Sequence, residues 1–115
     1  TQTERRASHI MVKIDENASP ADSLAAYKKA VQIRERLLKG EDFNKVAKEV
    51  SEDPSAKDNA GDLGFFSTFR MIYPFEDMAY KTPVGGLSPV FRTQYGYHVL
   101  KVTGERAARG EIRVA

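Results

Sequence analysis

Apolar residues along this chain change between a spacing of two and a helical spacing, and each change marks a predicted element. The first element is a strand over residues 7–14. Ile10 and Val12 share one of its faces. Met11 lies beside His9 on the other face. Because both faces carry apolar residues, we expect this strand to be central in its sheet and covered on both sides.

A strong helix start follows a short polar loop. Ser19 is suited to be the N-cap and Pro20 to take the first helical position. Asp22 adds a carboxylate three residues after the cap, and Gly40 is a natural C-terminal stop. Between these limits the apolar residues recur at helical spacing: Leu24, Tyr27, Ala30, Val31, Ile33, Leu37 and Leu38.

A second helix is predicted directly after the first. Asp42 is its expected N-cap, and residues 43–50 carry an apolar stripe at helical spacing. Residues 51–60 are polar and are interrupted by Pro54, which predicts a loop. Residues 62–66 predict a short strand, and the glycines at 61 and 64 indicate close approach to a neighbouring backbone.

The C-terminal half adds one helix and two strands. The helix is predicted to begin near Pro74 and to turn three apolar residues inward: Phe75, Met78 and Ala79. Strands are predicted over 88–92 and 97–103, with Pro89 tolerable only at a strand start or edge. Strands that are separated in this way, with few βαβ repeats, predict an α+β domain with a mainly antiparallel sheet.

Composition limits the function classes that need to be considered. The chain has 115 residues, enough for one domain with a real core, and is 41% hydrophobic and 30% charged, which is ordinary for a soluble globular protein. Eighteen basic residues oppose sixteen acidic ones, so a net charge of +2 gives no reason to expect nucleic acid as a partner. Apolar runs fall short of the roughly 18 residues of a membrane span, so we expect no membrane insertion.

The chain contains no cysteine, which excludes a disulfide, a thiolate nucleophile and a sulfur metal site. Two histidines alone do not suggest a structural zinc site, and we expect neither a metal nor a cofactor. A composition without cysteine suits an oxidising compartment. Residues 1–6 do not resemble a signal peptide, so we expect any targeting segment to have been removed or to be absent from this sequence.

Three short motifs occur in order along the chain. Ala-Ser-His-Ile-Met-Val stands at 7–12, Gly-Asp-Leu-Gly-Phe-Phe at 61–66 and Thr-Gln-Tyr-Gly-Tyr-His at 93–98. One such motif alone is a weak signal. Together, with both histidines in place, they resemble the parvulin family of peptidyl-prolyl cis-trans isomerases. The resemblance runs from about Arg6 to Gly104, which is nearly the whole chain.

The resemblance implies a parvulin-like (FKBP-like) fold, in which helices surround a four-stranded, mainly antiparallel sheet. It predicts a single isomerase domain over residues 1–105, monomeric when isolated. Residues 106–115 are expected to be a tail or linker, or else the opening of a second parvulin repeat, as in the tandem domains of SurA-type chaperones. Those chaperones belong to the bacterial periplasm, so we expect a periplasmic or otherwise extracytoplasmic location rather than a cytoplasmic one.

Rotation about an X-Pro bond breaks amide resonance and has a barrier of roughly 18–20 kcal/mol. A catalyst must grip the proline ring, remove water from the amide and favour the twisted bond, and it needs no covalent chemistry. The positions that match the proline-binding residues of the family are all apolar: Leu63, Phe66, Met71 and Phe75. Taken singly, each is an ordinary core residue, and the resemblance assigns them as a set to a pocket.

A polar cluster is expected beside the rotating carbonyl. The resemblance places His9 and His98 on neighbouring strands, where opposite tautomers can hydrogen-bond, and Thr93 beside them. We interpret the two histidines as organisers of the site rather than proton shuttles. Asp53 falls where parvulins place a cysteine or an aspartate, and its charge could act on the carbonyl as conjugation is lost. The loop register leaves Pro54 as an alternative occupant, and the surrounding residues are also good turn chemistry.

The predicted function is isomerisation of X-Pro bonds in unfolded or extended, proline-containing polypeptide clients, which assists protein folding. Phosphate-directed parvulins carry arginine and lysine in the loop after the first strand, whereas residues 13–19 are net acidic here. We therefore expect no specificity for phosphorylated clients. The alternative is a catalytically weak peptide-binding module of a multidomain folding factor. A purely structural spacer is disfavoured, because a spacer needs no polar network in its core.

Overall fold

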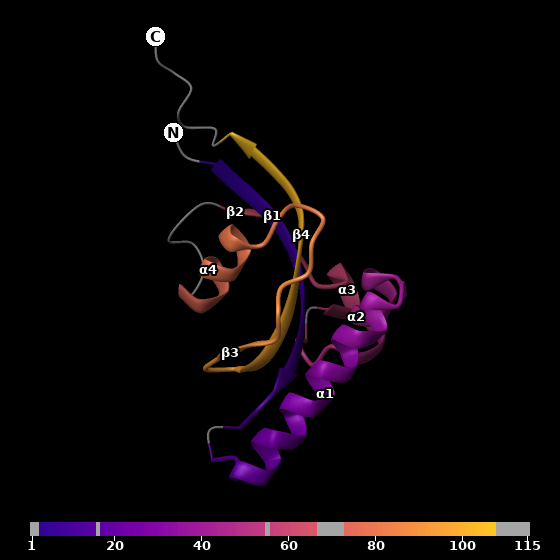
Figure 1. Cartoon of the computed structure of the whole chain (residues 1–115), viewed down its shortest axis with the longest axis vertical. Helices are drawn as coiled ribbons and strands as arrows, with labels where there is room; N and C mark the ends of the chain where they lie inside the picture. Colours follow the sequence, from indigo (N-terminus) through magenta and orange to yellow (C-terminus); the bar gives the residue numbers. More distant parts are fainter. Residues whose placement is uncertain (1–2, 16, 55, 67–72, 108–115) are drawn as a thin grey trace.

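The computed structural model describes residues 3–15, 17–54, 56–66 and 73–107 (Figure 1). Within them, eight elements follow one another along the chain: β1 (Thr3–Lys13), α1 (Pro20–Leu38), α2 (Phe43–Val50), α3 (Ala56–Asn59), β2 (Asp62–Phe66), α4 (Tyr73–Lys81), β3 (Phe91–Thr93) and β4 (Gly96–Ala107). In the part of the chain described, helices are all too short or too polar to cross a membrane.

The four strands form one sheet in the order β2-β1-β4-β3, and every neighbouring pair is antiparallel. β1 and β4 are the central strands, and they pair from Thr3 opposite Ala107 to Lys13 opposite Gly96. The predicted α+β fold with a four-stranded antiparallel sheet is confirmed. β1 also has the central place that its two apolar faces predicted.

The sheet separates two apolar clusters. On one face, α1 and α2 pack against the middle of β1 and β4, where Ile10, Val12 and Val99 meet the helices. On the other face, α4 covers a second cluster of buried residues: Ala7, Phe66, Phe75, Ala79, Phe91 and Leu100. Figure 1 shows α1 and α2 on one side of the long β1–β4 ribbon and α4 on the other. The face under α4 carries the candidate site.

α1 begins as its capping residues predict. Ser19 accepts a hydrogen bond from the backbone N–H of Asp22 at 3.1 Å, and Pro20 is the first helical residue. The buried part of its apolar stripe consists of three residues: Ala30, Ile33 and Leu37. Three other members of the stripe are exposed: Leu24, Tyr27 and Leu38. The helical spacing is therefore confirmed, although part of the stripe faces solvent.

The segment after α2 differs from the prediction. α2 begins after Asp42, which accepts the N–H of Lys45 at 3.1 Å as the expected N-cap. Within the predicted loop 51–60, residues Ala56–Asn59 form the short helix α3. A single helical turn is too short to show a period of apolar residues, so a polar composition conceals it.

β3 also differs from the prediction, because it spans Phe91–Thr93 rather than 88–92. Pro89 has no N–H to donate to a ladder, so regular pairing of β3 with β4 begins only after it. Ser88 pairs with β4 in another way. Its N–H donates to the carbonyl of Leu100 at 2.7 Å, and its hydroxyl accepts the N–H of Leu100 at 3.0 Å.

β1 and β4 are longer than predicted at the end of the sheet where charged residues meet. β1 begins at Thr3 rather than at residue 7, and β4 continues to Ala107, two residues into the segment expected to be a tail. Charged residues give no apolar alternation, so the pattern missed this pairing. Residues 108–115 lie outside the described part of the chain. Two cross-strand ion pairs stabilise this end: Arg5–Glu105 at 2.9 Å and Glu4–Arg106 at 2.8 Å.

Candidate active site

The two histidines lie on the central strands, on the face that α4 covers. His9 of β1 pairs with Leu100, and His98 of β4 pairs with Met11, so the imidazoles are diagonal neighbours on one face. Their Nδ1 atoms are 3.2 Å apart, and their rings stack with centroids 5.4 Å apart. Both residues are almost fully buried, with 7% and 3% of their surface exposed.

Thr93 and Asp53 extend this pair at its two ends. Thr93 Oγ1 lies 2.7 Å from His98 Nε2 and accepts the backbone N–H of Tyr95 at 3.1 Å. Asp53 Oδ2 lies 2.7 Å from His9 Nε2. The four side chains Asp53, His9, His98 and Thr93 therefore form a continuous hydrogen-bonded series, which we call the polar row.

When both imidazoles are neutral, the carboxylate at one end of the polar row determines which ring nitrogens carry a proton. A carboxylate at Asp53 can only accept, so His9 donates through Nε2 and accepts through Nδ1. His98 must then donate through Nδ1, which leaves its Nε2 to accept the hydroxyl of Thr93. The two histidines thus take opposite tautomers, and each contact of the row has one donor and one acceptor.

His98 is held neutral by its surroundings. Burial lowers the pKa of its imidazole, the neighbouring His9 lowers it further, and Asp53 opposes both effects, with a resulting pKa of about 4 instead of 6.5. A neutral His98 keeps one ring nitrogen that can accept, whereas a protonated imidazole could only donate. At neutral pH the row is therefore suited to keeping a fixed geometry rather than to exchanging protons.

The loop after α2 brings Asp53 around the edge of β1. The N–H of Glu52 donates to the carbonyl of Met11 at 2.8 Å, and the N–H of Met11 donates to Ser51 Oγ at 3.1 Å. These bonds occupy the part of the β1 edge that β2 does not reach. They place the side chain of Asp53 against the polar row, whereas Pro54 is exposed.

Gly61, the first residue of the Gly-Asp-Leu-Gly motif, lies directly against the backbone of His9. The N–H of His9 donates to the carbonyl of Gly61 at 3.0 Å. A Cβ atom at Gly61 would lie 2.2 Å from the carbonyl oxygen of His9, and the φ of +82° also favours glycine. The predicted close backbone approach is confirmed at Gly61, just before β2, but not at Gly64 within it, where nothing lies within 4 Å of a Cβ atom.

Two phenylalanines frame the polar row. Phe75 of α4 lies edge-on to both imidazoles, with ring centroids 5.3 Å from His9 and 5.9 Å from His98. Phe91 of β3 is opposite His98 in the ladder and stacks on it, with centroids 5.4 Å apart. Both phenylalanines are buried. The row therefore has an apolar wall on the side of α4 and β3.

Sequence reasoning missed Phe91. The signal that could have found it is the turn at Gln94 and Tyr95. A two-residue turn sets Thr93 opposite Gly96, and counting outward from that pair sets Phe91 opposite His98.

The other predicted pocket residues are placed as follows. Leu63 of β2 is half-buried and packs against the cluster that contains Phe75. Phe66 is buried in the same cluster, and its ring lies edge-on to Tyr80 with centroids 6.3 Å apart. Met71 lies outside the described residues, so its place in the predicted pocket stays a prediction.

A hollow of about 920 Å³ borders the polar row at the end of β1. Met11 and Tyr95 link it to the row, because Met11 pairs with His98 and the N–H of Tyr95 binds Thr93. Its lining includes one cationic and two anionic side chains: Lys13, Asp15 and Asp22. We call it the acidic hollow. Within the described residues, histidines and carboxylates form no group of three that could hold a metal ion.

Comparison with known proteins decides the family. A family model described as the PPIC-type PPIASE domain matches residues 1–106. The chain belongs to the PPIC-type peptidyl-prolyl isomerases, the parvulins. The resemblance carried by the three sequence motifs is confirmed, and the polar row lies in a parvulin domain.

Curated relatives of this parvulin domain are named as folding factors. It is 48% identical over 98 residues to "Foldase protein PrsA" of Geobacillus kaustophilus, covering 85% of this chain and 31% of that protein. It is 43% identical over 108 residues to "Chaperone SurA" of Pseudomonas syringae pv. tomato, covering 91% of this chain and 24% of that protein. The parvulin domain thus spans less than a third of the length of these two relatives.

A solved structure has the same fold along almost its whole length. NmPin, the parvuline of Nitrosopumilus maritimus, matches with a TM-score of 0.65 at 36% identity. The match covers 90% of this chain and 98% of that chain. The parvulin-like fold predicted from the sequence is confirmed.

Proposed function

We propose that this parvulin domain catalyses cis/trans isomerisation of X-Pro bonds in unphosphorylated, extended polypeptide segments, and so assists client proteins to fold. The polar row beside Phe75 carries the proposal, because it sets a fixed polar surface next to an apolar one in a member of an isomerase family. The words foldase and chaperone in the names of the relatives support polypeptide clients.

Asp53 is the member of the row that would act on the peptide. Its side chain is 20% exposed, more than the 8% of its partner His9. In a planar amide the carbonyl oxygen carries more negative charge than in a twisted one, because conjugation delocalises the nitrogen lone pair onto it. A carboxylate beside that oxygen therefore disfavours the planar form and lowers the barrier to rotation.

The other three members of the row would keep Asp53 in place. His9 binds the carboxylate directly, and His98 and Thr93 fix the tautomer and orientation of His9. The proline ring would pack against Phe75, where burial removes water from the amide. In this mechanism no proton leaves the row and no covalent bond forms.

The acidic hollow supports a preference for unphosphorylated clients. Asp15 and Asp22 line it together with Lys13, so the charge of these three side chains sums to a negative value. A phosphorylated residue before proline would bring close to two further negative charges toward them. Tight phosphate binding favours arginine in a bidentate arrangement, which these lining side chains cannot provide.

The second candidate function is a module that binds proline-containing segments without accelerating their isomerisation, and the word chaperone in the name of a relative is compatible with it. Exchange NMR on a short Ala-Pro peptide separates the two candidates. We expect a substoichiometric amount of the domain to accelerate cis/trans exchange. Shifted peptide signals without faster exchange would support the binding module, and unchanged spectra would reject both.

Phe75→Ala tests the apolar wall in the same assay. Truncating a buried phenylalanine costs roughly 3–5 kcal/mol of stability, so the assay needs a variant with an equal loss elsewhere. Phe43→Ala is that control, since Phe43 is equally buried on the opposite face of the sheet. We expect loss of activity in Phe75→Ala only. Equal activity in the two folded variants would exclude this wall from the site.

We also propose that the domain acts outside the cytoplasm, which its foldase and chaperone relatives support. The absence of cysteine suits an oxidising compartment. Cell fractionation of the full-length protein, with a cytoplasmic and an exported marker, checks this. Recovery with the cytoplasmic marker would contradict it without bearing on the isomerase activity.

A further inference from the structure

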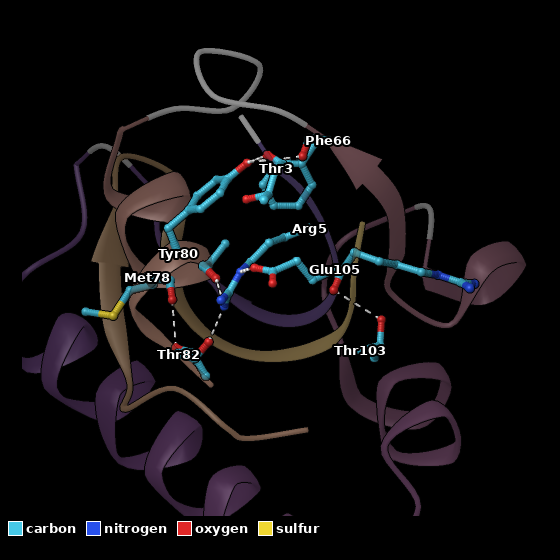
Figure 2. Close-up of polar contacts among 10 residues, drawn as sticks. Thr3, Arg5, Phe66, Met78, Tyr80, Thr82, Thr103 and Glu105 are labelled. Atoms are coloured by element: carbon cyan, nitrogen blue, oxygen red, sulfur yellow. Dashed lines mark hydrogen bonds and ion pairs between the residues drawn. The ribbon is translucent and has the colours of Figure 1, made fainter. Parts of the chain in front are cut away.

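Arg5 fastens the C-terminal end of α4 to the central strands. It projects from β1 toward that end of the helix (Figure 2), where its Nη1 donates to the carbonyl of Ala79 at 3.0 Å and to the carbonyl of Thr82. Its Nε donates to Glu105 of β4 at 2.9 Å. The side chain is only 14% exposed. We call Arg5, Ala79, Thr82 and Glu105 the α4 anchor.

The chemistry of a helix end explains why an arginine is suited to this place. The last carbonyls of a helix have no partner within it, and the aligned peptide dipoles make this end negative. Thr82 satisfies one of them, since its N–H and its hydroxyl both donate to Met78, at 3.0 and 2.7 Å. Arg5 brings a positive charge and two further donated bonds, while Glu105 orients its guanidinium from the other side.

Tyr80 adds a second connection between α4 and the sheet. Its hydroxyl donates to the carbonyl of Thr3 at 2.8 Å and lies 3.4 Å from the carbonyl of Phe66 (Figure 2). The guanidinium of Arg5 lies 5.8 Å from the centre of its ring. The end of α4 is therefore fixed relative to β1, β2 and β4 together.

The same short helix carries Phe75 against the polar row. Phe75 is one helical turn before Ala79, so the two residues are about 6 Å apart along the axis. One turn of i→i−4 backbone hydrogen bonding joins Phe75 to Ala79, so the two residues are expected to shift together. A tilt or shift at the anchor therefore changes the distance of Phe75 from His9 and His98, which is now 5.3 and 5.9 Å between ring centroids.

We propose that Arg5 is a positioning residue of the proline site: by fastening α4, it sets the place of Phe75 over the polar row. This inference rests on the proposed isomerase function, because it concerns the same wall of the same site. Arg5 contacts α4 and β4, and it acts on the client through Phe75.

The test compares two arginines at the same end of the sheet. Arg5→Met keeps a long apolar side chain and removes every donor to α4. Arg106→Met is the matched control, because Arg106 also pairs with a cross-strand carboxylate, at 2.8 Å, and covers the ring of Phe65 rather than α4. The KM and kcat of both variants are measured on an Ala-Pro peptide, at a temperature where each variant is folded.

We expect Arg5→Met to raise KM and to lower kcat/KM about tenfold, since a site group displaced by about 1 Å can cost up to 100-fold. Arg106→Met should leave both constants at the wild-type values. Arg5→Lys should recover part of the loss, because it keeps a positive charge at the helix end. Wild-type constants in folded Arg5→Met would overturn the inference.

A double-mutant cycle separates positioning from general stability. If Arg5 acts through Phe75, adding Arg5→Met to Phe75→Ala should cause no further loss in kcat/KM. If Arg5→Met lowers kcat/KM by the same factor in the wild type and in Phe75→Ala, the inference is overturned. Should Arg5→Met fail to fold, Glu105→Gln takes its place in the cycle, with a smaller expected loss because the guanidinium keeps its bonds to α4.

An NMR measurement that does not depend on catalysis distinguishes failure of the role of Arg5 from failure of the proposed isomerase function. The imidazole NMR signals of His9 and His98 sense the edge of the Phe75 ring, so Arg5→Met should shift both and Arg106→Met neither. If the wild-type domain binds peptide without catalysis, the isomerase proposal fails, yet these shifts and a weaker peptide Kd are still expected. Unmoved imidazole signals would overturn the role of Arg5 alone.

Discussion

At the scale of single residues, the site depends on side chains whose roles exist only in combination. Asp53 would be an ordinary turn residue without His9, and His9 needs His98 to fix its tautomer. Burial keeps His98 neutral so that it can take part. A single substitution in the polar row therefore also changes the hydrogen bonds of the neighbouring members.

Asp53→Asn removes charge and keeps shape. The amide oxygen can still accept from His9 Nε2, so we expect the free energy of unfolding to change by no more than about 1 kcal/mol. If the carboxylate acts on the client carbonyl, kcat/KM should fall on the order of tenfold or more. Peptide exchange rates and urea unfolding measure the two quantities.

Glu52→Gln is the matched control for this substitution. Glu52 is the preceding residue of the same loop, and its carboxylate binds the N–H of Lys13 and the amine of Lys29 instead of the polar row. Its activity should stay at the wild-type value. An Asp53→Asn variant that is equally active would reduce Asp53 to a structural loop residue.

The lowered pKa of His98 predicts a pH dependence of stability. In the unfolded chain this imidazole titrates near pH 6.5, whereas in the folded domain its pKa is about 4. Between these values the unfolded chain binds more protons, so stability is complete above about pH 6.5 and falls as the pH is lowered toward 4. The loss between pH 7.5 and 5.0 should be about 2 kcal/mol.

Urea unfolding of wild type and His98→Gln over this pH range checks the prediction. The carboxyls of Glu41 and Asp62, whose pKa values arginine partners hold below their usual range, stay charged above pH 5 and add little. In His98→Gln the free energy of unfolding should no longer fall with pH in this way, even if it is lower than that of the wild type at pH 7.5. Parallel curves for the two proteins would contradict a neutral, buried His98.

At the scale of elements, local chemistry decides which bounds can be predicted. The start of α1 and the limits of β2 follow from caps and glycines a few residues away, and the sequence predicts both to the residue. The ends of β1 and β4 depend on charged partners about 100 residues apart, such as Arg5 and Glu105, so no local pattern contains them. α3 has a single turn, which is too short for a period.

Gly61, just before β2, and Gly64, within β2, should differ in the stability lost when each is replaced by alanine. Gly61→Ala places a methyl group 2.2 Å from the carbonyl oxygen of His9, which only a backbone shift can relieve. Gly64 has a similar positive φ of +71° but open space around it. We expect Gly64→Ala to cost about 1–2 kcal/mol and Gly61→Ala clearly more.

Thermal and urea unfolding of both glycine variants give these energies, and the imidazole signals of the polar row give a second measure. Gly61→Ala should also move the signal of His9, whose backbone it displaces. Equal costs for the two variants would mean that the close approach at Gly61 has no energetic weight.

At the scale of the whole molecule, the site is assembled from four separated segments, which are β1, the loop after α2, α4 and the β3–β4 hairpin. The sequence motifs predict His9, His98 and Thr93 in one cluster, because a family resemblance carries three-dimensional information that a single pattern lacks. The bond of Asp53 to His9 depends on how the loop after α2 crosses the edge of β1. The stacking of Phe91 on His98 depends on hairpin register. Neither is visible in composition or periodicity.

The charge around the acidic hollow predicts the response to phosphorylation. A phosphoserine before proline that entered the acidic hollow would meet the two carboxylates of Asp15 and Asp22 and, among the charges named as its lining, one cation, Lys13. Screened repulsion of exposed charges is modest, so we expect the Ser-Pro peptide to isomerise about two- to fivefold faster than its phosphorylated form. The ratio should grow at low ionic strength. A preference for the phosphopeptide would contradict the proposed client class.

The pairing of Thr3 with Ala107 bears on how such a fold can be accommodated in a longer polypeptide. Residues that face each other across an antiparallel ladder are only about 5 Å apart, so the chain enters and leaves the fold at nearly one point. A host chain receiving this domain in one of its loops would need almost no rearrangement of its own backbone. We therefore expect a host chain to tolerate the gain or loss of this fold as a unit.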